Sequence, residues 1–430
     1  MTTQVLKRQV SVCLGKAERL IGQLTYVKDG EREYSSFAYD NLWLAGPDRF
    51  EVSPDLPLVE GHLVRRAPTK DDSCFHFALA DTEPDAWGHR VVARAHAKER
   101  KKNPKLPALT AFDYLSAVDD VSRVGALRLR DGAGEFLRAV EKGGRAAPPL
   151  VELQHMYDAN RAVERGNETD EDLKYLLGKG TSLGGMRPKC TVLEEDGSLA
   201  LGKFPSVNDT RNVTRAEVLA LRLAERAGID AAHARIVQIG DAAVTVIRRF
   251  DRTDDYARIP YLSAASMLQA TRNEERAYTE VADIIRAKCA RPAEDAQQLW
   301  RRLVFNLLIT NIDDHLQNLG FLYVGQGTWR LAPAFDVNPF PDKDRESKTW
   351  LSEDMGPVTS LSMLMERADY FSLQPVEALK TLAAVYAAVC DWRTVALSAD
   401  VGLPETELDD FAPAFEHPDM NVARDLLRFA

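Results

Sequence analysis

The chain has 430 residues, 45% of them hydrophobic, which is enough for two or three domains with a real core. Its formal net charge of −10 argues against free nucleic acid as a direct partner, because phosphate contacts require a basic surface. The apolar runs fall short of the roughly 18 residues of a membrane span, and the cysteines form no CxxC pair typical of a zinc site.

The first 65 residues or so are predicted to be rich in β-strands. Val10, Val12 and Leu14 alternate with polar neighbours, and residues 20–27 follow as a second strand. A signal-peptide apolar stretch is missing from the N-terminal residues, so we expect a cytoplasmic protein without a membrane partner.

A helix is predicted from about residue 85, because residues 85–102 open with acidic and close with basic side chains, as the helix dipole favours. The basic stretch 98–105 is interpreted as a solvated helix end rather than a nucleic-acid contact. Glycines and prolines gather at residues 131–149, which indicates a linker.

The middle of the chain alternates helices and hairpins. We expect a helix at 150–164, a Gly-rich segment, a hairpin that turns at Glu194–Gly197, and a helix at 214–227. A second strand pair turns at Gly240–Asp241, and the chain is mostly helical from about 260. This order is the gross plan of a two-lobed kinase.

The most informative segment is residues 307–323, LLITNIDDHLQNLGFLY, where polar residues interrupt two apolar elements. The polar residues are Asn311, Asp313, Asp314, His315 and Asn318. Polar groups placed between apolar elements need hydrogen-bond partners or a ligand. A loop with helix caps would explain one or two of them, but not this density.

Phosphoryl transfer explains the spacing. A kinase needs a carboxylate that orients the attacking hydroxyl, an Asn five residues later for Mg²⁺, and a second Asp from a following turn. Asp313 and Asn318 have this spacing, and Asp336 follows the predicted strand 329–331, although no DFG tripeptide is present. Asp314 is the alternative base, but it lies one residue too close to Asn318.

Five motifs together resemble the HipA family of kinases, the toxins of type II toxin–antitoxin modules. They occur in family order between about residues 180 and 340, and the N-terminal module also resembles the β-rich domain that precedes the kinase in this family. The motifs are SLGGMRPK (182–189), GKFP (202–205), RRFDR (248–252), NIDDHLQN (311–318) and LAPAFDVNP (331–339).

The resemblance implies an α+β, two-lobed protein-kinase-like fold with an N-terminal β-rich module and a helical C-lobe. The expected parts are an N-terminal module at 1–130, a kinase N-lobe core with the Gly-rich loop at 150–253, and a C-lobe at 254–430. The implied activity is an ATP- and Mg²⁺-dependent serine/threonine protein kinase.

The resemblance also implies the roles of individual residues. Asp313 would be the catalytic base, Lys203 would contact the ATP phosphates, and Asn318 and Asp336 would hold Mg²⁺ beside the nucleotide. Lys203 could equally be an ordinary surface lysine when its motif is ignored. Glu217, on the helix after the lysine strand, could pair with it.

Further nucleotide contacts are implied in the loop and the hinge. Ser182, Gly184, Gly185 and Lys189 would form the Gly-rich loop, and Ser182 matches the serine that HipA kinases autophosphorylate to switch themselves off. Added phosphate charge amid ATP-binding groups would disfavour the ATP-bound loop. The adenine contacts would be Arg249 and Phe250.

The partners implied by the family are a protein substrate of the aminoacyl-tRNA synthetase class and a small DNA-binding antitoxin. Two departures from the family pattern, Met186–Arg187 in the loop and Arg248 in the hinge, affect nucleotide contacts but remove no catalytic group. Two other functions stay open: a small-molecule kinase of related layout, and a pseudokinase that acts as a binding partner or co-repressor.

Overall fold

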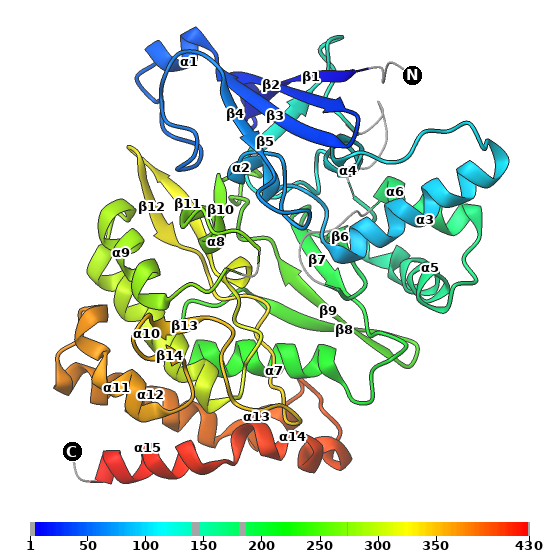
Figure 1. The fold of residues 1–430 in the computed structure, drawn as a ribbon. Helices are drawn as coiled ribbons and strands as arrows, with labels where there is room; N and C mark the ends of the chain where they lie inside the picture. The colour runs from blue at the N-terminus through cyan, green and yellow to red at the C-terminus, as the bar shows by residue number, and fades with distance from the viewer. Residues whose placement is uncertain (1–4, 140–146, 180–185, 273, 429–430) are drawn as a thin grey trace. The chain divides into compact units, whose positions relative to one another are not determined.

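The computed structural model describes residues 5–139, 147–179, 186–272 and 274–428. The chain forms two compact units (Figure 1). The first unit comprises Met1–Asn208 and Asp251–Leu262, and the second comprises Asp209–Phe250 and Ser263–Ala430. Within the described ranges, no helix combines the length and apolar character needed to cross a membrane.

The first unit contains a five-stranded antiparallel sheet with the order β4-β3-β2-β1-β5 (Figure 1). The predicted N-terminal strands are confirmed, and β5 joins them from far along the chain by pairing Ser11–Leu14 with Leu127–Arg130. The strands are β1 (Leu6–Leu14), β2 (Arg19–Asp29), β3 (Arg32–Tyr39), β4 (Leu63–Arg66) and β5 (Leu127–Arg130).

The helices of the first unit pack partly on one another. They are α1 (Asn41–Ala45), α2 (Phe77–Ala80), α3 (Ala86–Lys102), α4 (Ala111–Ala117), α5 (Leu153–Arg165) and α6 (Asp170–Lys179). The predicted helices at 85–102 and 150–164 are therefore confirmed as α3 and α5. Trp87 of α3 is buried against Ala159 and Val163 of α5 and Leu173 of α6, so it is a core residue.

The basic stretch 98–105 forms the end of α3 and the following turn. Lys98 donates to the carbonyl of Glu168, just before α6, and Lys102 donates to Asp170, the first residue of α6, so part of this charge connects α3 to the start of α6. Basic residues in the last turn of α3 also complement the helix dipole.

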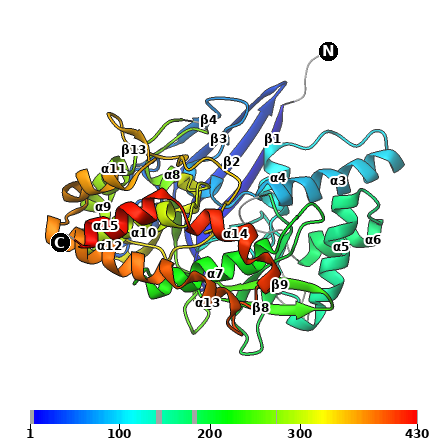
Figure 2. The ribbon, with the colours of Figure 1, turned by 90° about the horizontal axis from the view of Figure 1, so that it is seen from below.

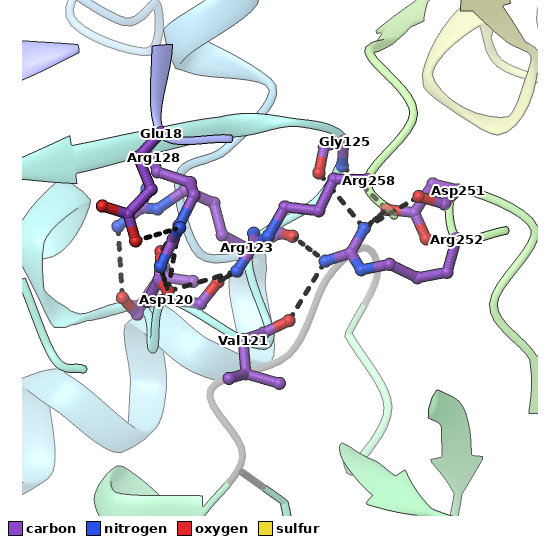
Figure 3. Close-up of polar contacts among 10 residues, drawn as sticks. Glu18, Asp120, Val121, Arg123, Gly125, Arg128, Asp251, Arg252 and Arg258 are labelled. Carbon is purple, nitrogen blue, oxygen red and sulfur yellow. Dashed lines mark hydrogen bonds and ion pairs between the residues drawn. The ribbon is translucent and has the colours of Figure 1, made fainter. Parts of the chain in front are cut away.

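A charged network joins residues 251–258 to the loop before β5 (Figure 3). Asp120 accepts hydrogen bonds from Arg128 at 2.7 and 2.9 Å and lies 3.2 Å from Arg258. Arg252 donates to the carbonyls of Val121, Arg123 and Gly125, while Asp251 accepts from the Gly125 N–H at 2.7 Å. The last two residues of the RRFDR motif therefore have structural contacts here.

A hairpin of β6 (Lys189–Leu193) and β7 (Leu199–Lys203) completes the first unit and turns at Gly197, which has a φ of +83°. The second unit has a matching hairpin of β8 (Ala234–Ile239) and β9 (Ala242–Arg248), against which α7 (Val213–Arg226) packs. Both predicted hairpins and the predicted helix at 214–227 are confirmed. Along the chain, the first unit ends at Leu262 and the second resumes at Ser263, within β10 (Tyr261–Ser263).

The second unit is otherwise mostly helical. Helix α10 (Pro292–Leu308) packs against α9, α11, α12 and α15, with α15 running beside it in Figure 2. The other elements are α8 (Ala264–Met267), α9 (Tyr278–Lys288), β11 (Gly320–Gly325), β12 (Thr328–Leu331), β13 (Trp350–Ser352), β14 (Gly356–Pro357), α11 (Leu361–Glu366), α12 (Pro375–Cys390), α13 (Trp392–Leu397), α14 (Leu408–Phe415) and α15 (Pro418–Arg428).

The compact units do not follow the predicted boundary at residue 253. Residues 209–250 pack with the helical part because the apolar face of α7 contacts α12 and α13 as well as its own hairpin. Compact units need not coincide with the lobes of a fold family, so the ranges 1–130, 150–253 and 254–430 stay a prediction.

Candidate active site

The loop that follows α10 is anchored at its first residues. Leu299, Leu303 and Leu307 are buried along α10, which fixes this helix in the core of the second unit. Thr310 then takes a φ of +53° and donates its hydroxyl to the Ala414 carbonyl at 3.0 Å. The Asn311 amide donates to the Asn306 side chain at 3.0 Å, so the chain leaves the helix in a fixed direction.

Asp314 is buried beneath this loop and has a structural role. Its carboxylate accepts hydrogen bonds from the Tyr278 hydroxyl at 2.6 Å and the Lys348 main-chain N–H at 2.8 Å. Its carbonyl accepts from the hydroxyls of Tyr278 and Thr349. Burial raises the pKa of Asp314 to about 6, and the donors oppose this rise.

We predict that Tyr278→Phe lowers the free energy of unfolding by about 1.5–3 kcal/mol, the range for a hydrogen bond to a charged group. Chemical denaturation measures the loss. Tyr370→Phe is the matched control, because Tyr370 donates to Asp283 at 2.9 Å at the surface and its removal should cost less than about 1 kcal/mol. Equal losses in the two variants would contradict a structural role for Asp314.

Asp313 has a different environment from its neighbour. Its side chain is 41% exposed, and one carboxylate oxygen forms an ion pair with the Lys348 ammonium. The His315 ring lies 3.9 Å from the same oxygen. An exposed carboxylate can meet a substrate, whereas the enclosed carboxylate of Asp314 is committed to main-chain and hydroxyl donors.

Asn318 ends a 3₁₀ turn at Leu316–Asn318, and its side-chain amide points at the main chain of Asp313. The Asn318 Nδ2 donates to the Asp313 carbonyl at 2.9 Å, which turns the amide oxygen away from that carbonyl. This hydrogen bond therefore links the two residues, Asp313 and Asn318, whose five-residue spacing was noted in the sequence. An amide oxygen and a carboxylate, completed by phosphates and water, form a donor set that suits Mg²⁺.

Asp336 follows the β11–β12 hairpin, after Ala334 bonds the backbone of Asp230 and Ala232. It has a φ of +54°, in the left-handed region that few residues other than glycine adopt. The negative charges of Asp336 and Asp313 both act to raise the pKa of His315, although burial outweighs them and lowers it. Asp336 therefore lies in the same electrostatic environment as Asp313.

Phe250, one of the two residues expected near the adenine, lies beside the turn that carries Asp336. The Phe250 ring packs against Phe335, with the ring centroids 5.4 Å apart, and Arg249 is buried. Phe335 directly precedes Asp336, so Phe250 and Asp336 are brought together within the second unit. Arg248, the departure from the family pattern, is exposed.

The lysines expected at the nucleotide belong to the first unit. Lys203 is 6% exposed and opposes Lys189 across the β6–β7 hairpin, so it is no ordinary surface lysine. The Lys189 ammonium lies 3.3 Å from the Asp85 carboxylate, which also caps α3 by accepting from the Gly88 N–H. Ser182, Gly184 and Gly185 lie outside the described residues.

Glu217 belongs to α7 in the second unit. It is 3% exposed, so it is a buried glutamate and not one of the solvated glutamates common on helix surfaces. The predicted pairing of Glu217 with Lys203 stays a prediction.

We predict that Asp85→Asn lowers the free energy of unfolding by about 3 kcal/mol, because it weakens the charge pairing of the buried Lys189 ammonium. Asn still caps a helix, so the cap itself is retained. The double variant Asp85→Asn/Lys189→Met should recover part of the loss. Denaturation of Asp85→Asn, Lys189→Met and the double variant gives the coupling energy between the two side chains. Strictly additive losses would show that the pair does not act as a unit.

Sequence reasoning missed Lys348 and Tyr278, which contact Asp313 and Asp314 respectively. Lys348 lies 35 residues after Asp313 in the charged stretch DKDRESK (342–348), and Tyr278 lies 36 residues before Asp314 at the start of α9. No local spacing links these residues to the loop of Asp313 and Asp314, because only the fold of the second unit brings them there.

Comparisons with known proteins agree with this architecture. Residues 181–393 match the HipA-like C-terminal domain family. A relative from Sinorhizobium fredii, Y4mE, named as a presumed kinase, is 25% identical over 409 residues, which is 90% of this chain and 85% of the relative.

The fold is also similar to a solved structure of Shewanella oneidensis MR-1 HipA, which was determined with HipB and its operator DNA. The likeness has a TM-score of 0.62 at 15% sequence identity and covers 97% of this chain and 96% of that one. The α+β, kinase-like fold expected from the sequence is therefore confirmed. Residues 181–393 thus match the HipA-like C-terminal domain, and the fold of the whole chain is similar to that of HipA.

Proposed function

We propose that the chain is an ATP- and Mg²⁺-dependent serine/threonine protein kinase that acts as a HipA-type toxin. The observation that supports this proposal most is that the two neighbouring aspartates of the Asp313–Asn318 loop have different environments. One aspartate is exposed and ion-paired, the next is buried and fixed, and Asn318 bonds the main chain of the exposed one. This is the arrangement that a positioned catalytic carboxylate requires.

In this proposal the acceptor serine or threonine oxygen attacks the γ-phosphorus of ATP. The bond between that phosphorus and the bridging oxygen of the ADP leaving group breaks, and the acceptor proton moves to the Asp313 carboxylate. Asn318 and Asp336 would hold Mg²⁺, which neutralises charge on the phosphates when bound. Lys203 would contact the phosphates, supported by Lys189, while Arg249 and Phe250 would lie near the adenine.

Regulation and partners are proposed from the family resemblance. Ser182 would be the autophosphorylated residue of the Gly-rich loop, with Gly184 and Gly185 following it. The protein substrate would be an aminoacyl-tRNA synthetase, and the cell compartment would be the cytoplasm. A small DNA-binding antitoxin would be the partner, in keeping with the HipB that accompanies Shewanella oneidensis HipA.

Binding of Mg·ATP tests the first half of the proposal. A ligand present at 100 times its dissociation constant adds about 2.7 kcal/mol to the folded state, so the melting temperature should rise when ATP and Mg²⁺ are both present. Asp336→Asn should reduce the part of the shift that depends on Mg²⁺. A wild-type protein with no shift would favour the pseudokinase, and transfer to an aminoglycoside but not to protein would favour the small-molecule kinase.

A further inference from the structure

We propose that Lys348 is a positioning residue for phosphoryl transfer, which holds the Asp313 carboxylate so that its second oxygen receives the acceptor proton. This inference rests on the proposed kinase function and assigns a role that the motifs do not contain. It starts from the ion pair between the Lys348 ammonium and Oδ1 of Asp313.

A simple stabilising ion pair does not account for the arrangement. The two side chains are 56% and 41% exposed, and ion pairs exposed to this extent contribute little to the stability of the fold. The main chain at Lys348, in contrast, is fixed firmly. Its N–H donates to Asp314 at 2.8 Å, and the hydroxyl of the buried Thr349 donates to the Asp314 carbonyl at 2.9 Å.

The flanking residues are anchored as well. The Ser347 hydroxyl donates to the Thr349 carbonyl at 2.6 Å and accepts from the Val358 N–H at 2.7 Å. The Trp350 N–H donates to the Arg276 carbonyl at 3.0 Å. On the other side, Arg345 contacts His417 and Asp419 at the start of α15.

The lysine is thus carried by a segment that is held at both ends and in its middle. Asp314 joins this segment to the catalytic loop, since it is the neighbour of Asp313 and the acceptor for Lys348. Because the main chain at Lys348 is fixed, less conformational entropy is lost when the Lys348 ammonium binds the Asp313 carboxylate.

The geometry also separates the roles of the two oxygens of Asp313. Within the described part of the chain, the Lys348 and His315 side chains both approach Oδ1. Oδ2 is then the oxygen that accepts the hydroxyl proton, while Oδ1 stays with the ammonium through the reaction. Because Lys348 acts through the base, its loss should change the rate of transfer more than the binding of nucleotide.

The test compares Lys348→Ala, Lys348→Arg and Lys343→Ala with the wild type. Lys343 is an exposed lysine of the same segment, so its replacement is matched in charge and position. The assays are release of phosphate from Mg·ATP with water as acceptor, incorporation of phosphate into the protein by intact mass, and the dissociation constant of Mg·ATP by calorimetry.

Lys348→Ala should lower kcat about tenfold to a hundredfold, as expected when a reacting group loses its alignment, and change the nucleotide dissociation constant less than about threefold. Lys348→Arg should retain most of the wild-type rate, because it keeps a cationic side chain on the same fixed main chain. Lys343→Ala should match the wild type. A Lys348→Ala variant as fast as Lys343→Ala, or one whose defect lies wholly in nucleotide binding, would overturn the role of Lys348 alone. A wild type that neither binds Mg·ATP nor transfers phosphate would overturn the kinase proposal and this inference with it.

Discussion

Asp313→Asn is expected to lower kcat for phosphoryl transfer by about 10²- to 10⁴-fold, the range that general acid–base catalysis contributes. The amide keeps the size and shape of the side chain but cannot take the acceptor proton. It also loses the ion pair with Lys348, whose ammonium donates to the carboxylate. Initial rates of ADP release at saturating Mg·ATP measure the effect.

Two controls make this result specific to Asp313. Asp409→Asn removes a carboxylate that is 93% exposed and ion-paired with Arg393, and it should leave the rate unchanged. Asp314→Asn should lower stability more than Asp313→Asn does, because Asp314 accepts buried hydrogen bonds. A full rate in Asp313→Asn, with the loss found in Asp314→Asn instead, would transfer the role of base to Asp314.

Asp336→Gly is expected to separate stability from activity. The variant removes a carboxylate proposed to hold Mg²⁺, so transfer should fall at least about a hundredfold. Glycine adopts a φ of +54° more readily than aspartate, so the free energy of unfolding should stay within about 1 kcal/mol of the wild type or rise. Rates and denaturation curves on the same preparation give both quantities.

The chain offers a matched control for this backbone change. Gln326 has a φ of +53° in the exposed turn of the β11–β12 hairpin. Gln326→Gly therefore relieves the same backbone strain at a position away from the candidate site. It should leave the rate as in the wild type. Activity retained by Asp336→Gly would contradict the metal-binding role, and a large loss of stability would show that the carboxylate mainly supports the fold.

Local features of the fold could be predicted from the sequence. The pattern of apolar residues identified β1 and α7, the charges at its two ends identified α3, and turn residues located the two hairpins, because these signals lie within a few neighbouring residues. The pairing of β5 with β1 joins residues more than 100 positions apart, and no local pattern specifies such a partner. The assignment of residues 209–250 to the second unit depends in the same way on the packing of α7.

The candidate site shows the same limit. Asp313 and Asn318 could be paired from their spacing because one short loop holds both, and the fold bonds Asn318 to the Asp313 main chain. The distinct environments of Asp313 and Asp314 differ in burial, and the contacts that enclose Asp314 come from Tyr278 and Lys348, which lie some 35 residues away on either side. Spacing alone could favour Asp313, but it could not explain the function of its neighbour.

The central claim is that this HipA-like chain transfers phosphate from ATP to protein, and intact-mass spectrometry tests it most directly. The wild-type protein is first treated with phosphatase, separated from it and incubated with Mg·ATP. It should gain the mass of phosphate, and Asp313→Ala should gain none. Ser182→Ala should also lack the addition if the loop serine is the acceptor, and a phosphate elsewhere would move the regulatory site but keep the kinase. A dephosphorylated wild type that stays unmodified and releases no ADP in the presence of a synthetase substrate would contradict the claim.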